Sequence, residues 1–175
     1  MTKNALVVVD VEADGPIPPV YSMVSFGAVI VTPNLDLTFY SRVSPISPKW
    51  DPEALAHSGC ESREAHIKTG KEPALVMAEF ANWLKDNIKG NPIFITDNLA
   101  FDWQWINYYF HVYYGSNPFG YSGRRIGDLY CGLVKDIRAK WKYLRDTKHT
   151  HHPVDDAKGN AEVILKMYNL GLKNG

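Results

Sequence analysis

The sequence predicts a mixed α/β fold in which helices cover the faces of one central sheet. Residues 6–43 contain apolar, β-branched stretches separated by short turns, which is typical of an antiparallel strand meander. The later part of the chain alternates a short apolar strand with stretches of helical hydrophobic spacing. The chain has 175 residues and no visible domain boundary, so we expect one domain over residues 1–175 with a sizeable core.

The meander is expected to begin with a buried strand at residues 6–9, because its Leu-Val-Val-Val sequence suits a pleated sheet and shows no helical period. The density of Gly and Pro predicts a loop at 14–19. Two more strands are expected at 23–31 and 37–43, joined by a turn at 33–36.

The rest of the chain reads as helices around one further strand. The expected elements are, in order, a short helix at 53–57, a long helix at 72–88, a buried strand at 93–96, a helix at 99–114, a helix that follows residues 125–129, and a last helix at 156–170. The long helix is expected to end at Gly90-Asn91-Pro92, because Gly and Pro terminate helices.

Composition restricts the possible functions. Lys plus Arg and Asp plus Glu are equal at 19 each, so no global field draws the chain onto long nucleic acid, and any such substrate must be held locally by metal and by stacking. Cys60 and Cys131 are far apart and form no Cys-x-x-Cys pattern, which argues against a zinc ribbon and fits a reducing cytoplasm, the expected location. No stretch predicts a signal peptide or a membrane-spanning helix.

Asp10 and Glu12 form the first candidate site. Side chains alternate along a strand, so both carboxylates point to the same side. Two adjacent carboxylates at the end of a buried strand repel each other and are costly to desolvate, and a hard divalent cation such as Mg²⁺ offsets that cost. The alternative is a pair of acids that are only solvated.

Two later segments add polar side chains to this site. Asp102 falls in the first turn of the helix at 99–114, and Asn98 stands where it could cap that helix, so a simple helix-start acid is the alternative interpretation. The segment His149-Thr150-His151-His152 precedes Asp155 and Asp156. Here the alternative is a polar loop in which Asp155 caps the last helix.

The order and spacing of these motifs resemble the DEDDh family of 3′–5′ exonucleases, also called DnaQ-like or RNase T-like. The motifs are D-x-E on a strand, N-x-x-F-D at a helix start and H-x-x-x-x-D near the end, and they cover nearly the whole chain. Residues 25–29 and 53–59 resemble the family's second strand and its short helix before a glycine, and 125–129 resembles a strand that ends in Asp before a helix. The resemblance implies an RNase H-like fold, with a mixed five-stranded sheet (antiparallel meander plus parallel strands) flanked by helices.

The resemblance also implies roles for individual residues. Asp10, Glu12, Asp102 and Asp156 become the metal-binding, catalytic carboxylates, and two divalent ions, Mg²⁺ or Mn²⁺, become the cofactors. His151 becomes the general base, because it lies five residues before Asp156, whereas His152 and Asp155 have the wrong offset. We expect the loop at 148–152 to become ordered when substrate and metal bind.

Other residues are expected to contact the substrate. Asp14 and Gly15 lie in the loop beside the carboxylate pair, where many family members have Thr-Thr-Gly or Thr-Gly. Phe101 is the best candidate for stacking on a base, Asn98 lies close to it in sequence, and Met23 is expected to border the pocket for the terminal sugar. Most of the other aromatic residues of the helix at 99–114 are expected in the core or in a subunit contact, which is compatible with the homodimers seen in relatives.

The implied function is a 3′–5′ exonuclease that hydrolyses phosphodiester bonds at the 3′ ends of single-stranded RNA or DNA. The neutral charge and small size slightly favour RNA ends and short substrates. Two alternatives stay open: a non-catalytic nucleic-acid-binding module of the same fold, and a phosphodiesterase that acts on short oligonucleotides or free nucleotides. The first alternative ranks lower, because all four carboxylates and the histidine are present. Most basic residues between 124 and 148 are expected to be solvated, and a few to guide the phosphate backbone.

Overall fold

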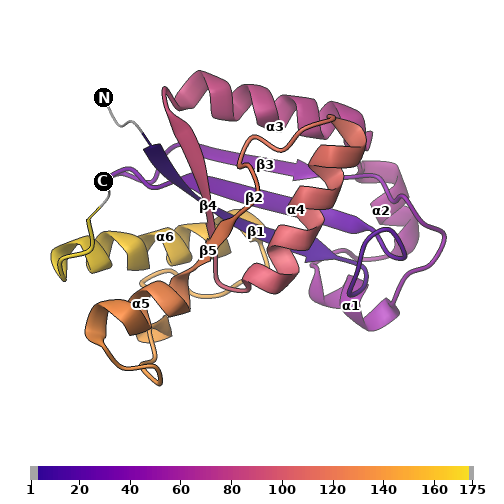
Figure 1. Cartoon of the computed structure of the whole chain (residues 1–175). Coiled ribbons are helices and arrows are strands. Elements are labelled where there is room, and N and C mark those ends of the chain that lie inside the picture. Colours follow the sequence, from indigo (N-terminus) through magenta and orange to yellow (C-terminus); the bar gives the residue numbers. More distant parts are fainter. Residues whose placement is uncertain (1–3, 174–175) are drawn as a thin grey trace.

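The computed structural model describes residues 4–173 and contains a five-stranded mixed sheet in the order β3-β2-β1-β4-β5 (Figure 1). Three strands form the antiparallel meander: β1 (Asn4–Ala13), β2 (Met23–Ile30) and β3 (Thr38–Arg42). Strands β4 (Asn91–Thr96) and β5 (Gly123–Arg125) add to the other edge of β1 in parallel. The predicted fold class is therefore confirmed.

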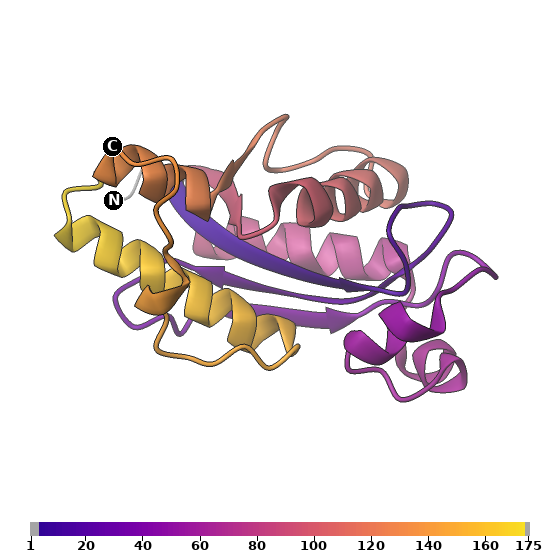
Figure 2. The same cartoon turned by 90° about the horizontal axis from the view of Figure 1, so that it is seen from below.

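Helices cover both faces of the sheet, as the two views show (Figures 1 and 2). Helices α3 (Pro73–Asn87) and α4 (Leu99–Tyr113) lie on one face, and α5 (Ile126–Val134) and α6 (Pro153–Asn169) lie on the other. Two short helices, α1 (Pro52–His57) and α2 (Arg63–Thr69), lie at the end of the sheet where β1 finishes. A 3₁₀ turn at Lys142–Leu144 precedes α6.

Alternation along β1 sorts its side chains between the two faces. Val7, Val9 and Val11 are buried in the core that includes α3 and α4, whereas Leu6 and Val8 belong to the core formed with α5 and α6. The next even-numbered residues along the strand are the two acids. They therefore point toward the α6 face, and the hydrophobic pattern of the strand itself decides which helix they meet.

Most predicted elements begin and end within a few residues of their observed bounds, with two informative differences. Strand β1 continues through both acids to Ala13, because its pairing with β2 extends to Glu12 opposite Ser25 and Ala13 opposite Met23. Helix α6 begins at Pro153 instead of Asp156, since the fixed φ of proline suits the first turn of a helix.

Two expectations need correction, and one helix was not predicted. Residues 125–129 do not form a strand that ends in Asp128: β5 ends at Arg125, opposite the last residue of β4, and Asp128 lies in the first turn of α5. Asn98 occupies the N-cap position of α4, but its side chain makes no capping hydrogen bond to the described residues. The sequence reasoning also missed α2, because seven residues are too few to show a helical period clearly.

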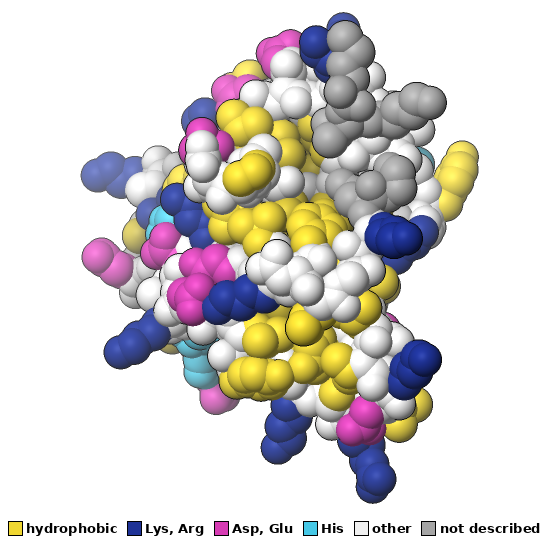
Figure 3. Space-filling model, turned by 90° about the vertical axis from the view of Figure 1, so that its left-hand side faces the viewer, with side chains coloured by type: hydrophobic (Ala, Val, Ile, Leu, Met, Phe, Trp, Pro, Cys, Tyr) yellow, Lys and Arg dark blue, Asp and Glu magenta, His cyan; other side chains and the backbone are white. Residues whose placement is uncertain are grey.

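Figure 3 shows the end of the molecule where β1 begins and α6 ends. Hydrophobic side chains gather in the middle of this end, and Lys and Arg side chains surround them. A small pocket of about 180 Å³ is lined there by residues that include Leu6, Ile93, Leu129 and Tyr168. Among the described residues, no helix combines the length and the apolar character that a bilayer crossing requires.

Candidate active site

Strand β1 and helix α6 bring three of the predicted acids together. Asp10, Glu12 and Asp156 each offer a carboxylate oxygen, and these oxygens lie within 4.8 Å of one another. Asp156 is buried in the first turn of α6, whereas Asp10 and Glu12 keep partial exposure. Three oxygen donors at this spacing, open on one side, match the preference of hard divalent cations for carboxylates. The donor set therefore fits a divalent metal ion.

Gly27 allows α6 to come this close to the sheet. It is the partner of Asp10 across β1 and β2. A Cβ atom at this position would lie 2.6 Å from the carbonyl carbon of Pro153 and 2.6 Å from the amide nitrogen of Val154. Only a residue without a side chain fits such an approach of two backbones, so Gly27 helps to place Asp156 over the two acids of β1.

Asp102 reaches the same site from the opposite face of the sheet but is not part of this three-residue cluster. Its Oδ1 accepts a hydrogen bond from the Val11 amide at 3.0 Å, and its Oδ2 accepts one from the Thr96 hydroxyl at 2.5 Å. Strand β4 ends at Thr96, and the pairing of β1 with β4 extends only to Val8. Beyond that point the Asp102 side chain, in place of a strand residue, accepts the hydrogen bond from β1. Its second oxygen connects α4 to the end of β4.

The pKa values of Asp10, Glu12 and Asp102 are raised above their usual range. Burial, followed by repulsion from Asp102, Glu12 and Asp156, raises the pKa of Asp10 well above its usual range. Burial and the charges of Asp156 and Asp102 raise the pKa of Glu12 to about 8. Burial raises the pKa of Asp102 to about 7, although its hydrogen bonds from Thr96 and Val11 oppose the rise. Ionised carboxylates in this arrangement need a compensating cation.

Asp156 is surrounded by hydrogen-bond donors. Its Oδ1 accepts from Arg145 Nη2 at 3.0 Å and from the Thr150 amide at 3.2 Å. Its Oδ2 accepts from the His151 amide at 3.0 Å and lies 2.7 Å from His149 Nδ1. The loop before α6 is thus tied to Asp156 through its backbone, and His149, not His151, presents its ring to the carboxylate.

The ring of His151, the predicted base, is exposed beside the site. Its backbone has a φ of +58°, a left-handed conformation that is uncommon outside Gly, Asn and Asp. Its ring centroid lies 4.4 Å from that of His149 and 6.3 Å from that of His57 at the end of α1. Three histidine rings therefore line the approach to the acids.

An open pocket of about 410 Å³ adjoins the acidic cluster and contains several predicted substrate contacts. Glu12, Gly15 and Phe101 line it, together with Asp51 and His57. Phe101 is partly exposed, which suits a stacking surface, and Asn98 is exposed at the start of the same helix. The structure thus places two predicted contact residues, Gly15 and Phe101, in the lining of this pocket.

Asp14 and Met23 differ from expectation. Both side chains are fully buried, so neither is open to a substrate in this structure. Asp14 forms an ion pair with Arg63 of α2 and accepts a hydrogen bond from the Ser22 amide at 2.5 Å. The Met23 amide donates to the Tyr109 hydroxyl at 2.9 Å. These contacts have a structural role. Asp14 connects the loop beside the pocket to α2, and the Met23 backbone connects β2 to α4.

Sequence reasoning gave no role at the site to Arg63, Thr96, Arg145 or His149. Arg145 is one of the basic residues between 124 and 148, most of which are expected to be solvated, and nothing in the sequence around it distinguishes it from Lys142 or Lys148. One weak sequence signal for Arg145 is Gly159 in the middle of α6. Glycine weakens the interior of a helix, so its presence there suggests that another group packs closely against it. The crowded aromatic residues of α4 are mostly core, as expected: Trp105, Tyr109 and Phe110 are fully buried.

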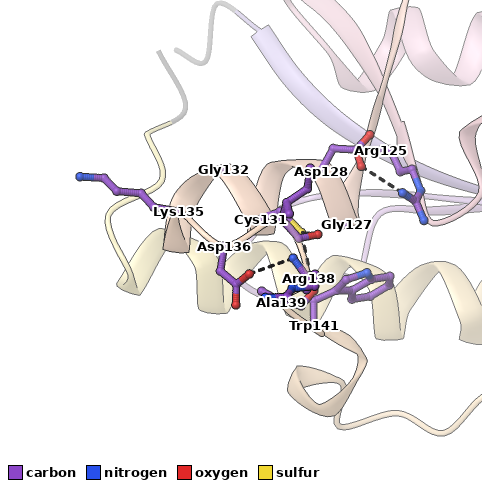
Figure 4. A pocket seen from close by; sticks show the side chains of 11 residues that line it. Arg125, Gly127, Asp128, Cys131, Gly132, Lys135, Asp136, Arg138, Ala139 and Trp141 are labelled. Carbon is purple, nitrogen blue, oxygen red and sulfur yellow. Dashed lines mark hydrogen bonds and ion pairs between the residues drawn. The ribbon is translucent and has the colours of Figure 1, made fainter.

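A pocket of about 520 Å³ lies between α5 and the loop at 135–141 (Figure 4). Its lining includes Arg125, Arg138 and Trp141, and Arg125 forms an ion pair with Asp128. None of its lining residues belongs to the acidic cluster. Pocket size therefore does not identify the catalytic centre here, whereas the chemistry of the converging acids does.

Comparison with solved structures identifies the fold. The nuclease domain of 3′hExo, a DEDDh family member bound to rAMP, superposes with a TM-score of 0.76 at 19% identity, over 95% of this chain and 92% of that chain. Exonuclease I of E. coli in complex with a dT13 oligonucleotide gives a TM-score of 0.71 at 13% identity, over 95% of this chain and 41% of that chain. Together with the order of the acidic motifs, the fold is that of the DEDDh 3′–5′ exonucleases, hydrolases of phosphodiester bonds.

Sequence comparison then specifies the family. Residues 5–168 match the family model described as the 3′-5′ exoribonuclease Rv2179c-like domain. The chain is also 35% identical to the 3′-5′ DNA exonuclease Cap18 of Escherichia coli, over 98% of this chain and 95% of the relative. This chain belongs to the Rv2179c-like 3′-5′ exoribonuclease family.

Proposed function

We propose that this protein removes mononucleotides from the 3′ ends of single-stranded nucleic acid, with two divalent ions, Mg²⁺ or Mn²⁺, held by Asp10, Glu12, Asp102 and Asp156. The observation that carries the proposal is the convergence of Asp10, Glu12 and Asp156 within 4.8 Å. Asp102 is included because its charge raises the pKa of both acids of β1, so it acts on the same site. We propose that residues 1–175 work as a single exonuclease domain.

In the proposed reaction, a water oxygen attacks the last phosphorus, and the bond from phosphorus to the 3′ oxygen of the preceding nucleotide breaks. The products are a nucleoside 5′-monophosphate and a strand shortened by one residue, with a free 3′ hydroxyl. Bound divalent ions supply Lewis-acid stabilisation of the developing negative charge and lower the pKa of water. The chain's own contribution is to hold the carboxylates at fixed positions and to accept the proton of the attacking water.

We propose His151 as the group that accepts this proton, because an imidazole titrates near neutral pH and its ring is exposed at the site. In this structure the His149 ring contacts Asp156 Oδ2, and the amides of Thr150 and His151 donate hydrogen bonds to the same carboxylate. Binding of metal and substrate is proposed to displace the His149 ring and to order the loop, with the His151 ring turned toward the attacking water.

The pocket beside the acids is proposed to receive the terminal nucleotide. Phe101 offers a ring for stacking on the base, and Gly15 is proposed to contact the nucleotide because it lines the same pocket. Asn98 is exposed at the start of the same helix as Phe101, and its amide is proposed as a further contact to the nucleotide. RNA is proposed as the slightly preferred substrate, because the family description names an exoribonuclease and the neutral chain suits short RNA ends. The E. coli relative is named a DNA exonuclease, so both sugars belong in the test.

The test uses matched, 5′-labelled single-stranded RNA and DNA oligonucleotides with Mg²⁺, Mn²⁺ or EDTA. We expect a ladder that shortens from the 3′ end, is absent in EDTA, and is faster on RNA. Asp10→Asn keeps the shape of the side chain and should lower kcat/KM more than about 100-fold, since loss of a mere outer partner of a metal ligand already costs about 10- to 100-fold. A folded protein that binds both oligonucleotides and shortens neither would favour the non-catalytic binding module.

Two further expectations stay predictions of the sequence. A homodimer is tested by light scattering of the full chain on a gel-filtration column. A phosphodiesterase acting on free nucleotides or dinucleotides is tested by offering dinucleotides beside longer oligonucleotides. Turnover of the dinucleotides alone would replace the proposed polymer substrate.

A further inference from the structure

Arg145 differs from the other basic residues around it. The segment at 124–148 is rich in Lys and Arg, and the ion pairs of Arg125 and Lys142 are exposed, with 50% and 65% of those side chains accessible. Only 9% of the Arg145 side chain is accessible, and its partner Asp156 is 1% accessible. Burying a guanidinium is costly unless an opposite charge compensates it. This pair is therefore a built feature of the acidic site, unlike a surface ion pair.

Helix α6 makes room for this guanidinium. A Cβ atom at Gly159 would lie 2.6 Å from both Nε and Nη2 of Arg145. Gly159 stands in the interior of α6, where glycine is less favourable than alanine by about 1 kcal/mol. By contrast, a Cβ at Gly132 on α5 would meet nothing within 4 Å. Glycine at position 159 therefore destabilises the helix, and the Arg145 side chain occupies the space where a side chain of residue 159 would lie.

The contacts of the guanidinium point to a task at the acids. Its Nη2 donates to Asp156 Oδ1 at 3.0 Å, whereas its Nε is buried and meets no hydrogen-bond partner among residues 4–173. The side chain is therefore held in place by its ion pair with Asp156 and by its packing against Gly159.

We propose that Arg145 is a positioning residue of the metal site: it fixes the orientation of the Asp156 carboxylate, and the missing side chain of Gly159 makes room for it. This inference rests on the proposed metal-dependent function. Arg145 acts through Asp156 and need not touch the substrate. Groups that orient a metal ligand in this way contribute about 10- to 100-fold to metal affinity.

The test is a titration of the full chain with Mn²⁺, followed by calorimetry or by the electron paramagnetic resonance signal of free Mn²⁺, well below the unfolding temperature. Arg145→Met should weaken Mn²⁺ binding by about 10-fold or more. Arg145→Lys keeps the charge but not the fork geometry and should fall between Met and the wild type. If the role of Arg145 were purely electrostatic, Arg145→Met would bind Mn²⁺ more tightly than the wild type, because removing a positive charge from an acidic site favours cation binding.

Gly159→Ala displaces the guanidinium without changing any charge, and Gly132→Ala is its matched control on a helix with open space. We expect weaker Mn²⁺ binding from the first and no change from the second. In the Arg145→Met background, Gly159→Ala should cost no further affinity, because the space is then free. Excess Mn²⁺ should restore the activity of both single variants.

Two results have distinct meanings. Wild-type affinity in both Arg145→Met and Gly159→Ala would overturn the positioning role while leaving the proposed exonuclease intact. A wild-type protein that binds no Mn²⁺ at all would overturn the metal-dependent function itself. The two failures are therefore separable in one series of titrations.

Discussion

Replacing Glu12 by Gln in metal-free protein should stabilise the fold at high pH. Burial and the charges of Asp156 and Asp102 raise the pKa of Glu12 from 4.5 to about 8. One unit of pKa corresponds to 1.36 kcal/mol, so the shift amounts to about 5 kcal/mol as an upper limit. Glu12 is partly exposed at an open pocket, where water screens the charges, and we expect about 2 kcal/mol.

The sign follows from the direction of the shift. The folded protein binds the Glu12 proton more tightly than the unfolded chain, so this proton stabilises the fold fully below pH 4.5. That contribution is lost as pH rises through about 8. The Gln variant cannot ionise and loses no stability at this position. The two proteins should therefore have similar stability near pH 4.5, and the variant should be more stable at pH 8.5 (about 2 kcal/mol).

The assay is urea unfolding in EDTA at both pH values, with Glu61→Gln, an exposed acid in the loop before α2, as a matched control. Adding Mn²⁺ should reverse the order at pH 8.5, because a ligand that binds only the folded state stabilises the protein that binds it better. A Gln variant that is less stable than wild type at pH 8.5 in EDTA, or a difference that is equal at both pH values, would refute the reasoning.

Four other substitutions test the site. Gly27→Ala pushes the start of α6 away from β2, so unfolding measurements should show a loss of about 1–3 kcal/mol together with reduced kcat; an unchanged kcat would mean that this close approach does not place the acids. Asp14→Asn leaves the buried charge of Arg63 uncompensated and should cost about 3 kcal/mol in urea unfolding while Mn²⁺ affinity stays near wild type. His151→Ala should lower kcat by about 10²- to 10⁴-fold with little change in KM. His149→Ala should cost far less, and the reverse ranking in the same assay would assign the base to His149.

The sequence by itself determined the elements and the chemistry of the acids. The β-branched run of β1 and the helical spacing of α3, α4 and α6 are local patterns, so each could be recognised without knowing its neighbours. Alternation along β1 predicts that Asp10 and Glu12 share a face, and the order of the acidic motifs led to the family. These are properties of short segments, in which side-chain direction follows directly from the backbone repeat.

Only the tertiary structure decided how those segments meet. The carboxylate oxygens of Asp102 accept hydrogen bonds from Thr96 and from Val11, which is 91 residues away, because β4 ends before β1 does. No local pattern separates the largely buried Arg145 side chain from its exposed basic neighbours, since its place depends on the missing side chain of Gly159 on another element. Such contacts join residues from different elements, and whether a charged side chain is buried or solvated depends on the packing of those elements and not on the period of either one.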